Sequence, residues 1–181
     1  LKKFLSRYKV VFVLLAFLLV FANQNNENLI MSSETNQFPS IQGNNLNKIK
    51  KTVPDDFVEK NLIVIVAFQQ WHQPLVDESI SLLENNGLGE THNIIEVPTV
   101  QKTTKLAEIY LDGIMRAGIR DDRIRNRTIT AYLDKNEFLE ILDIPSDETI
   151  HWFLIEKNSK DILARGYGII AEKDLEIINS Y

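Results

Sequence analysis

A short polar segment, WHQPL at residues 71–75, follows the apolar run LIVIVAF at residues 62–68 after two glutamines. Its candidate binding residues are Trp71, His72, Gln73 and Pro74. A helix that begins here would place its positive N-terminal end beside His72 and disfavour the charged imidazole. The neutral imidazole would then be free to bind a protein partner or an anion. The alternative is a partly exposed polar residue in a loop, with Trp71 packed beneath it.

A second candidate site is the arginine-rich segment RAGIRDDRIRNRT at residues 116–128. Its arginines are Arg116, Arg120, Arg123, Arg125 and Arg127. Guanidinium groups at this density can hold phosphate, lipid headgroups or an acidic protein loop through paired hydrogen bonds. The alternative is a solvated turn in which Asp121 and Asp122 neutralise part of the charge, since exposed ion pairs add little stability.

The composition excludes several kinds of chemistry. The chain has no cysteine, so disulfides, thiol redox chemistry, cysteine nucleophiles and thiolate metal sites are ruled out. His72, His92 and His151 are the only histidines and lack the HxxxH and HExxH spacings, so we expect no metal and no cofactor. No GxSxG motif and no argued pair of carboxylates occurs, so we assign no catalytic residue.

The bulk numbers suit a globular domain with an appendage. The chain has 181 residues, of which 44% are hydrophobic and 25% charged. Its formal net charge is -5. We expect no nucleic-acid partner, because surfaces that track phosphate backbones are normally basic.

Hydrophobic periodicity predicts the elements that must position these residues. The predicted strands and helices are, in chain order, strand 61–69, helix 74–86, strand 93–97 ended by Pro98, helix 101–118, strand 128–134, short helix 135–144, a hairpin of 149–157 with 161–168, and helix 171–181. In the helix at 101–118, the apolar residues lie at helical spacing on one face. The order β-α-β-α-β-(α)-β-β-α predicts an α/β fold, with a mixed sheet flanked by helices on both faces.

The N-terminal part divides into two segments before the domain at residues 56–181. Residues 1–22 carry a basic start and the apolar run VVFVLLAFLLVFA at 10–22. Three interpretations remain open: a signal peptide cleaved after Ala22, a retained membrane anchor over residues 4–22, or translation that starts at Met31. The first two place the domain on the extracytoplasmic side, and the third places it in the cytoplasm. Residues 23–55 are rich in Asn, Gln and Ser and predict a flexible polar tether, with a short strand or turn near 46–53.

This element order, with WHQPL at the first junction between strand and helix, resembles the thioredoxin-like superfamily. Trp71 and Pro74 match the Trp and Pro of the redox motif WCGPC, whereas His72, Gln73 and Leu75 stand where Cys, Gly and Cys would be. The closing hairpin and helix are also similar. One departure is that the cis-proline expected before the hairpin has no clear match, because Pro145 lies too early.

Within that superfamily, the chain resembles the mitochondrial ATP synthase assembly factor family and its prokaryotic relatives. The similar stretches are AFQQWHQPLVDESI, EVPTV, YLDGIMRAGI, YLDKNEFLEILDI and the final hairpin. The resemblance implies a non-redox helper near a membrane, with a protein partner that belongs to a membrane complex such as ATP synthase. The enzymatic alternative is a thiol-independent activity on an anionic small molecule, using His72 and an arginine from 116–127.

Overall fold

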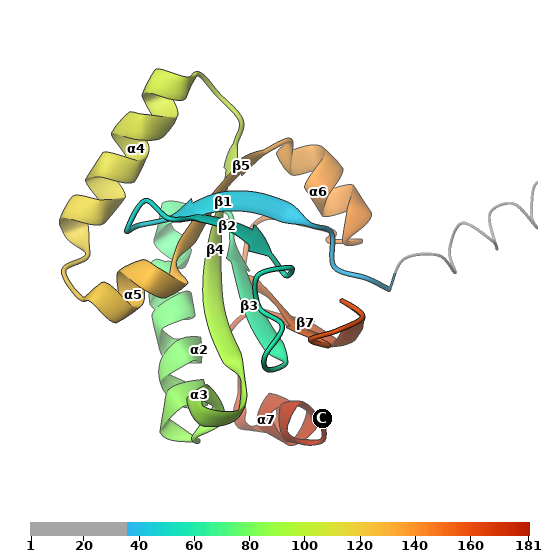
Figure 1. The fold of residues 1–181 in the computed structure, drawn as a ribbon. Helices are drawn as coiled ribbons and strands as arrows, with labels where there is room; N and C mark the ends of the chain where they lie inside the picture. The colour runs from blue at the N-terminus through green and yellow to red at the C-terminus, as the bar shows by residue number, and fades with distance from the viewer. Residues whose placement is uncertain (1–35) are drawn as a thin grey trace, which may run out of the picture. The chain divides into compact units, whose positions relative to one another are not determined.

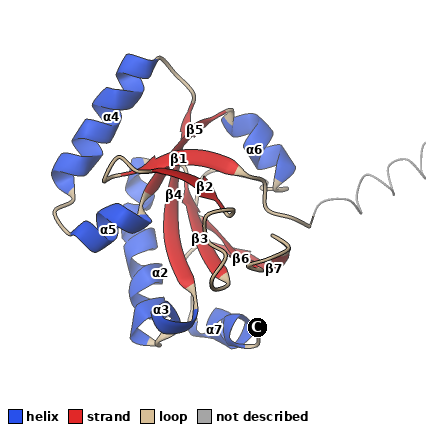
Figure 2. Ribbon diagram, in the orientation of Figure 1, coloured by secondary structure: helices blue, strands red, loops and turns tan. Residues whose placement is uncertain are grey.

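The computed structural model describes residues 36–181, which form a mixed sheet with helices around it (Figures 1 and 2). The strands are β1 (Ile41–Asn45), β2 (Lys50–Val53), β3 (Leu62–Ala67), β4 (Asn93–Gln101), β5 (Ile129–Leu133), β6 (His151–Ile155) and β7 (Ile162–Tyr167). The helices are η1 (Gln70–His72), α2 (Gln73–Asn85), α3 (Leu88–Thr91), α4 (Lys105–Gly118), α5 (Asp122–Arg127), α6 (Lys135–Ile141) and α7 (Glu172–Asn179).

The seven strands are arranged in the order β2-β1-β5-β4-β3-β6-β7. The central strands β5, β4 and β3 are parallel, as expected for strands joined through helices. The β6–β7 hairpin pairs antiparallel to β3, and the β1–β2 hairpin pairs antiparallel to β5. The predicted mixed α/β fold is therefore confirmed.

Strand β3 lies inside the sheet, between β4 and β6, and contributes side chains to the core on both faces. All six of its residues are buried, which explains the uninterrupted apolar run. Because side chains alternate along a strand, Val64 packs with the cluster that contains Phe38 and Phe138. Ile65 packs on the other face, with the cluster that contains α2 and α7 side chains such as Ile80 and Ile178.

Two boundary predictions are wrong. Pro98 does not end β4, which continues to Gln101. Pro98 occupies the last rung of the pairing with β3, opposite Ala67, where a missing donor does not interrupt the ladder.

The predicted tether at residues 23–55 also extends too far. Its C-terminal part forms β1 and β2, and Phe38, Ile41, Leu46 and Val53 are buried in the domain. Phe38 just before the hairpin, and the other three side chains within it, give this segment a core-facing side despite the Asn-rich composition. The compact unit begins at Gln37 rather than at residue 56. The predicted signal peptide or anchor at residues 1–22, and tether residues 23–35, lie outside the described residues.

Candidate functional site

The WHQPL segment lies at the C-terminal end of β3, as predicted. The chain leaves β3, makes the single turn η1 and enters α2 at Gln73, with Pro74 in the first helical turn. Proline is suited to this position, because the first amides of a helix have no intrahelical partner. The sequence motif therefore marks a real junction between strand and helix.

The two aromatic residues of this segment lie opposite to expectation. Trp71 is 67% exposed, whereas His72 is fully buried. Both sequence interpretations placed His72 at the surface, and this placement is wrong. The turn η1 directs the imidazole inward beneath the start of α2, and the indole outward.

His72 is held as a neutral imidazole inside the protein. Its Nδ1 accepts a hydrogen bond of 3.2 Å from the backbone N–H of Phe68, so the proton resides on Nε2. The buried Nε2 has no hydrogen-bond partner among the described residues. Burial lowers the pKa of His72, and the backbone of Glu148 and the charge of Asp147 act less strongly in the opposite sense. The neutral form was predicted from the helix N-terminus, but desolvation is the main cause.

The loop before β6 packs beside this histidine. Gln69 donates to Asp147 at 3.3 Å, and Lys135 forms an ion pair of 2.5 Å with the same carboxylate. His151, at the start of β6, contacts the backbone carbonyl of Ser146 at 3.0 Å. These contacts fix residues 146–148 against the end of β3. Within the described residues, the cis peptide bond is Val53–Pro54. The loop directly before β6 therefore contains no cis-proline.

Exposed aromatic side chains flank this end of the sheet. The ring of His151 lies between Phe68 and Tyr167, with centroid distances of 6.1 and 6.3 Å. Tyr167 is 78% exposed at the end of β7. We call the exposed side chains of Trp71 and Tyr167, together with loop residues 146–148, the Trp71 surface. Gln73, the other polar residue of WHQPL, does not belong to it, because its side chain turns toward β4.

The five arginines do not converge on one site. Arg116 donates to the carbonyl of Leu46 at 2.5 Å and so ties α4 to the β1–β2 turn. Arg125 donates to the carbonyls of Ile119 and Arg116 at 2.6 and 3.1 Å. Arg125 therefore satisfies carbonyls at the end of α4, and Arg116 satisfies one at the β1–β2 turn, so both guanidinium groups are engaged with backbone rather than with a common ligand.

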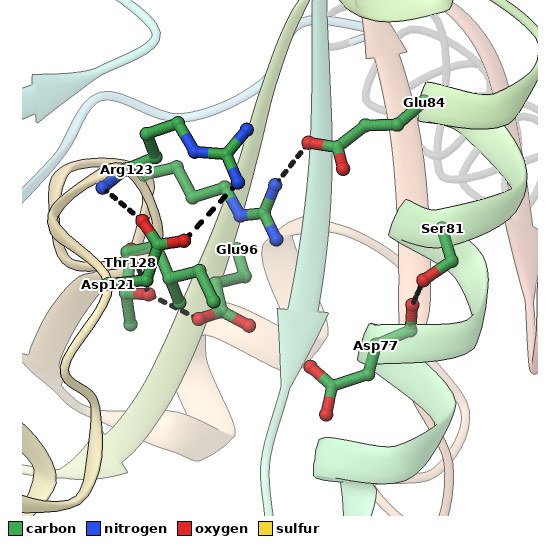
Figure 3. Close-up of polar contacts among 9 residues, drawn as sticks. Asp77, Ser81, Glu84, Glu96, Asp121, Arg123 and Thr128 are labelled. Carbon is green, nitrogen blue, oxygen red and sulfur yellow. Dashed lines mark hydrogen bonds and ion pairs between the residues drawn. The ribbon is translucent and has the colours of Figure 1, made fainter.

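Arg127 belongs to a polar network under α2 that contains Glu96. Arg127 pairs with Glu84 at 2.5 Å, while its Nε is buried without a partner among the described residues. Glu96, on β4, accepts hydrogen bonds from the Thr128 hydroxyl and, at 3.1 Å, from the Gln73 amide. Figure 3 shows Glu96 beside Thr128, with Glu84 and Asp77 on the facing helix.

Glu96 is the residue that sequence reasoning undervalued. It is 2% exposed, and burial raises the pKa of its carboxyl more than the hydrogen bonds from Thr128 and Gln73 lower it. Its signal was an acidic residue within the apolar strand NIIEV, because an isolated charge in a buried strand is costly unless it is paired or protonated.

Arg120 and Arg123 are the exposed members of the cluster. Arg123 pairs with Asp121 at 3.2 Å (Figure 3), which partly neutralises its charge, but residues 122–127 form helix α5 rather than the expected turn. His72 contacts Phe68, Trp71 and the loop before β6, whereas these arginines lie on the β5 side of the sheet. Because His72 is fully buried and β4 separates β3 from β5, the geometry does not bring His72 together with Arg120 or Arg123 as the enzymatic alternative requires.

Residues 36–181 contain neither a metal-binding cluster nor a membrane-spanning helix. No three or more His, Asp or Glu side chains gather in a way that would hold a metal ion. No helix within this range is long and apolar enough to cross a bilayer.

Comparison with solved structures identifies the fold. The pneumococcal exposed lipoprotein thioredoxin from Streptococcus pneumoniae superposes with a TM-score of 0.51 and 14% identity, over 79% of this chain and 100% of that one. A putative thiol:disulfide interchange protein DsbE from Chlorobium tepidum gives 0.50 and 11%, over 80% and 94%. A DsbF homologue from Corynebacterium diphtheriae gives 0.50 and 18%, over 82% and 90%.

The fold is thioredoxin-like. No family model matches the chain, and no curated protein matches it. Two of these structural neighbours are named as a thioredoxin and a putative thiol:disulfide interchange protein, whereas this chain has no cysteine. Thiol exchange is therefore excluded for this chain, and its buried neutral His72 offers no replacement nucleophile at the surface.

Proposed function

We propose that this domain is a non-redox binding module that holds a segment of a partner protein on the Trp71 surface. The observation that carries this proposal is the exposure of Trp71, at 67%, beside a position where a thiol would be needed for redox chemistry. A large indole exposed to water is unfavourable in isolation, and Trp and Tyr are the residue types that most often dominate protein interfaces.

The surroundings of Trp71 support a preformed surface. The loop at residues 146–148 is fixed by hydrogen bonds to Gln69 and His151, and by the ion pair with Lys135. A rigid surface loses little conformational entropy when it binds, which favours recognition over a surface that must first become ordered. The buried His72 then has a structural role, because it supports the backbone beneath the Trp71 surface.

The partner class follows from the resemblance of the sequence to ATP synthase assembly factors. On that basis we propose a membrane-proximal assembly factor whose partner is a subunit of a membrane complex, with ATP synthase as the first complex to examine. Residues 10–22 support a location near a bilayer, through their apolar composition alone. An anchored or exported domain on the extracytoplasmic side fits this proposal.

The test is affinity purification of the full-length chain from detergent-solubilised native membranes, with the bound proteins identified by mass spectrometry. Trp71→Ala should lose the partner while the fold is retained. Ile177→Ala is the matched control, because Ile177 is also an exposed apolar residue but lies on α7. A set of bound proteins unchanged by Trp71→Ala would refute the Trp71 surface. Absence of ATP synthase subunits from the wild-type sample would refute only the proposed complex.

A further inference from the structure

Helix α4 is packed with its apolar side outward. Its residues Leu106, Ile109, Tyr110 and Ile114 are 81%, 59%, 73% and 51% exposed. With 3.6 residues per turn, they lie within an arc of about 140° that also contains Gly113 and Ala117. We call these six residues the outer face of α4. The helix lies at the periphery of the domain (Figure 1), and no residue of α4 belongs to either core cluster.

The inner face of α4 is attached mainly by polar contacts. The Tyr132 hydroxyl donates to Asp112 at 2.7 Å and contacts the carbonyl of Glu108 at 3.1 Å. Arg116 binds the carbonyl of Leu46, and Arg125 binds the carbonyl of Arg116. The predicted apolar face of this helix is thus real, but the sheet does not cover it. A face of this kind requires another covering, because exposing four large apolar side chains to water is unfavourable.

The charges around α4 indicate what covers the outer face. Residues 101–128 carry seven Lys and Arg against four Asp and Glu, in a chain whose net charge is -5. The exposed cations Lys102 and Lys105 lie at the N-terminal end of the helix, and Arg120 and Arg123 lie beyond its C-terminal end. An apolar helix face bordered by cations is the pattern of helices that lie on anionic membranes. Tyr110 fits that environment, because aromatic residues with one polar group favour the headgroup level.

A depression beside the N-terminal end of α4 is suited to a headgroup. It has a volume of about 250 Å³, and its lining includes Lys50, Lys102 and Lys105. Lys105 is partly neutralised by Glu108 at 2.9 Å, whereas the ammonium groups of Lys50 and Lys102 form no hydrogen bond or ion pair within residues 36–181. These two ammonium groups are available to a lipid phosphate while the neighbouring Leu106 enters the acyl region.

The length of the chain before the domain is compatible with an anionic membrane on the outer face of α4. The apolar run ends at Ala22, and the described domain begins at residue 36. This interval spans at most about 50 Å when fully extended. A bilayer that holds the apolar run therefore lies within about 50 Å of residue 36.

We propose that α4 is a second membrane contact, which lies on an anionic bilayer through its outer face. Leu106, Ile109, Tyr110 and Ile114 enter the boundary between headgroups and acyl chains, and the bordering cations bind lipid phosphates. This contact holds the domain against the membrane in a fixed orientation. It does not depend on the Trp71 surface or on its partner.

The absence of cysteine permits a direct test with the full-length chain. A nitroxide label is attached at Ile109→Cys, and, as the control, at Ile177→Cys on α7. Each protein is reconstituted in phosphatidylcholine vesicles with and without phosphatidylglycerol. Collisions of the label with oxygen and with an aqueous nickel chelate are then compared. We expect the ratio of oxygen to nickel collisions to rise several-fold at position 109 in vesicles that contain phosphatidylglycerol, and to stay unchanged at position 177.

The outcomes separate the alternatives. A label at position 109 that remains in water would overturn the proposal, even if residues 10–22 hold the chain on the vesicles. Spin–spin broadening without lipid would overturn it in favour of a second copy of the chain on the outer face. Lys102→Glu combined with Arg120→Glu should abolish the rise, and its persistence would overturn the role given to anionic headgroups. Trp71→Ala should leave the rise intact, so this test and the partner test fail independently.

Discussion

At the residue scale, burial decides what His72 can do. Its Nδ1 accepts from the backbone of Phe68, and the side chain is fully enclosed. An enclosed neutral imidazole supports the local backbone but meets no solvent or substrate. Structural support, rather than catalysis, is therefore the role that the geometry gives to the residue in the first cysteine position of the WCGPC pattern.

This role predicts a specific pattern of stability. His72→Ala should lower the free energy of unfolding by about 2–4 kcal/mol, because it leaves a cavity and an unpaired Phe68 amide. His72→Asn should cost less, because its side-chain oxygen can take the place of Nδ1. Urea unfolding at pH 7 measures both. Equal losses for the two variants would show that the hydrogen bond to Phe68 contributes nothing.

Glu96 predicts a pH dependence. Because burial raises its folded-state pKa, the folded protein holds this proton more tightly than the unfolded chain. Its contribution to stability is present below the ordinary pKa of 4.5 and is lost as pH rises through the raised value. Glu96→Gln should remove this loss, so the variant gains stability relative to wild type as pH increases.

Urea unfolding of both proteins between about pH 4 and pH 8 isolates this effect. Burial lowers the pKa values of His72, His92 and His151, and these groups destabilise the fold as pH falls below their ordinary value. Both proteins share these histidines, so the difference between the two curves reports Glu96. Parallel curves would contradict a raised pKa for this carboxyl.

At the element scale, the arginine segment is mainly the connection between α4 and β5. Arg125→Ala should lower the free energy of unfolding by about 1–3 kcal/mol, because it removes hydrogen bonds from a charged donor to two backbone carbonyls. Arg120→Ala is the matched control and should change it by less than about 0.5 kcal/mol. Thermal or urea unfolding checks the pair. If both substitutions have the same small effect, the contacts of Arg125 contribute nothing measurable to stability.

The elements that were predictable are those whose side-chain pattern matches their burial. Strand β3 has no polar break and is buried throughout, and α2 buries Val76, Ile80 and Leu83 as its period indicates. Helix α4 was predictable as a helix, but periodicity cannot show which neighbour covers an apolar face. The burial of His72 was not predictable either, because it depends on the single turn η1 and on the loop before β6.

At the scale of the whole molecule, the β1–β2 hairpin extends the sheet beyond β5. Asn45 and Ile129 are paired partners in the register of β1 with β5, and Asn45 also binds Asn126 at 2.9 Å. The Asn-, Gln- and Ser-rich composition predicted a tether because it offers few apolar groups to offset the entropy cost of ordering. Here the Asn45 side chain also accepts hydrogen bonds from the amides of Asn47 and Ile49, which closes the turn between the two strands.

The hairpin predicts where the domain can be shortened. Residues 36–181 should unfold cooperatively, whereas residues 56–181 should not, because the latter lack Phe38, Ile41, Leu46 and Val53. Burial of a large apolar side chain contributes about 1.5–3 kcal/mol, so these four approach the total stability of a typical domain. The loss also leaves the edge of β5 without its partner. Circular dichroism melting and amide NMR dispersion distinguish the two fragments, and cooperative melting of residues 56–181 would show that the hairpin is an accessory to the fold.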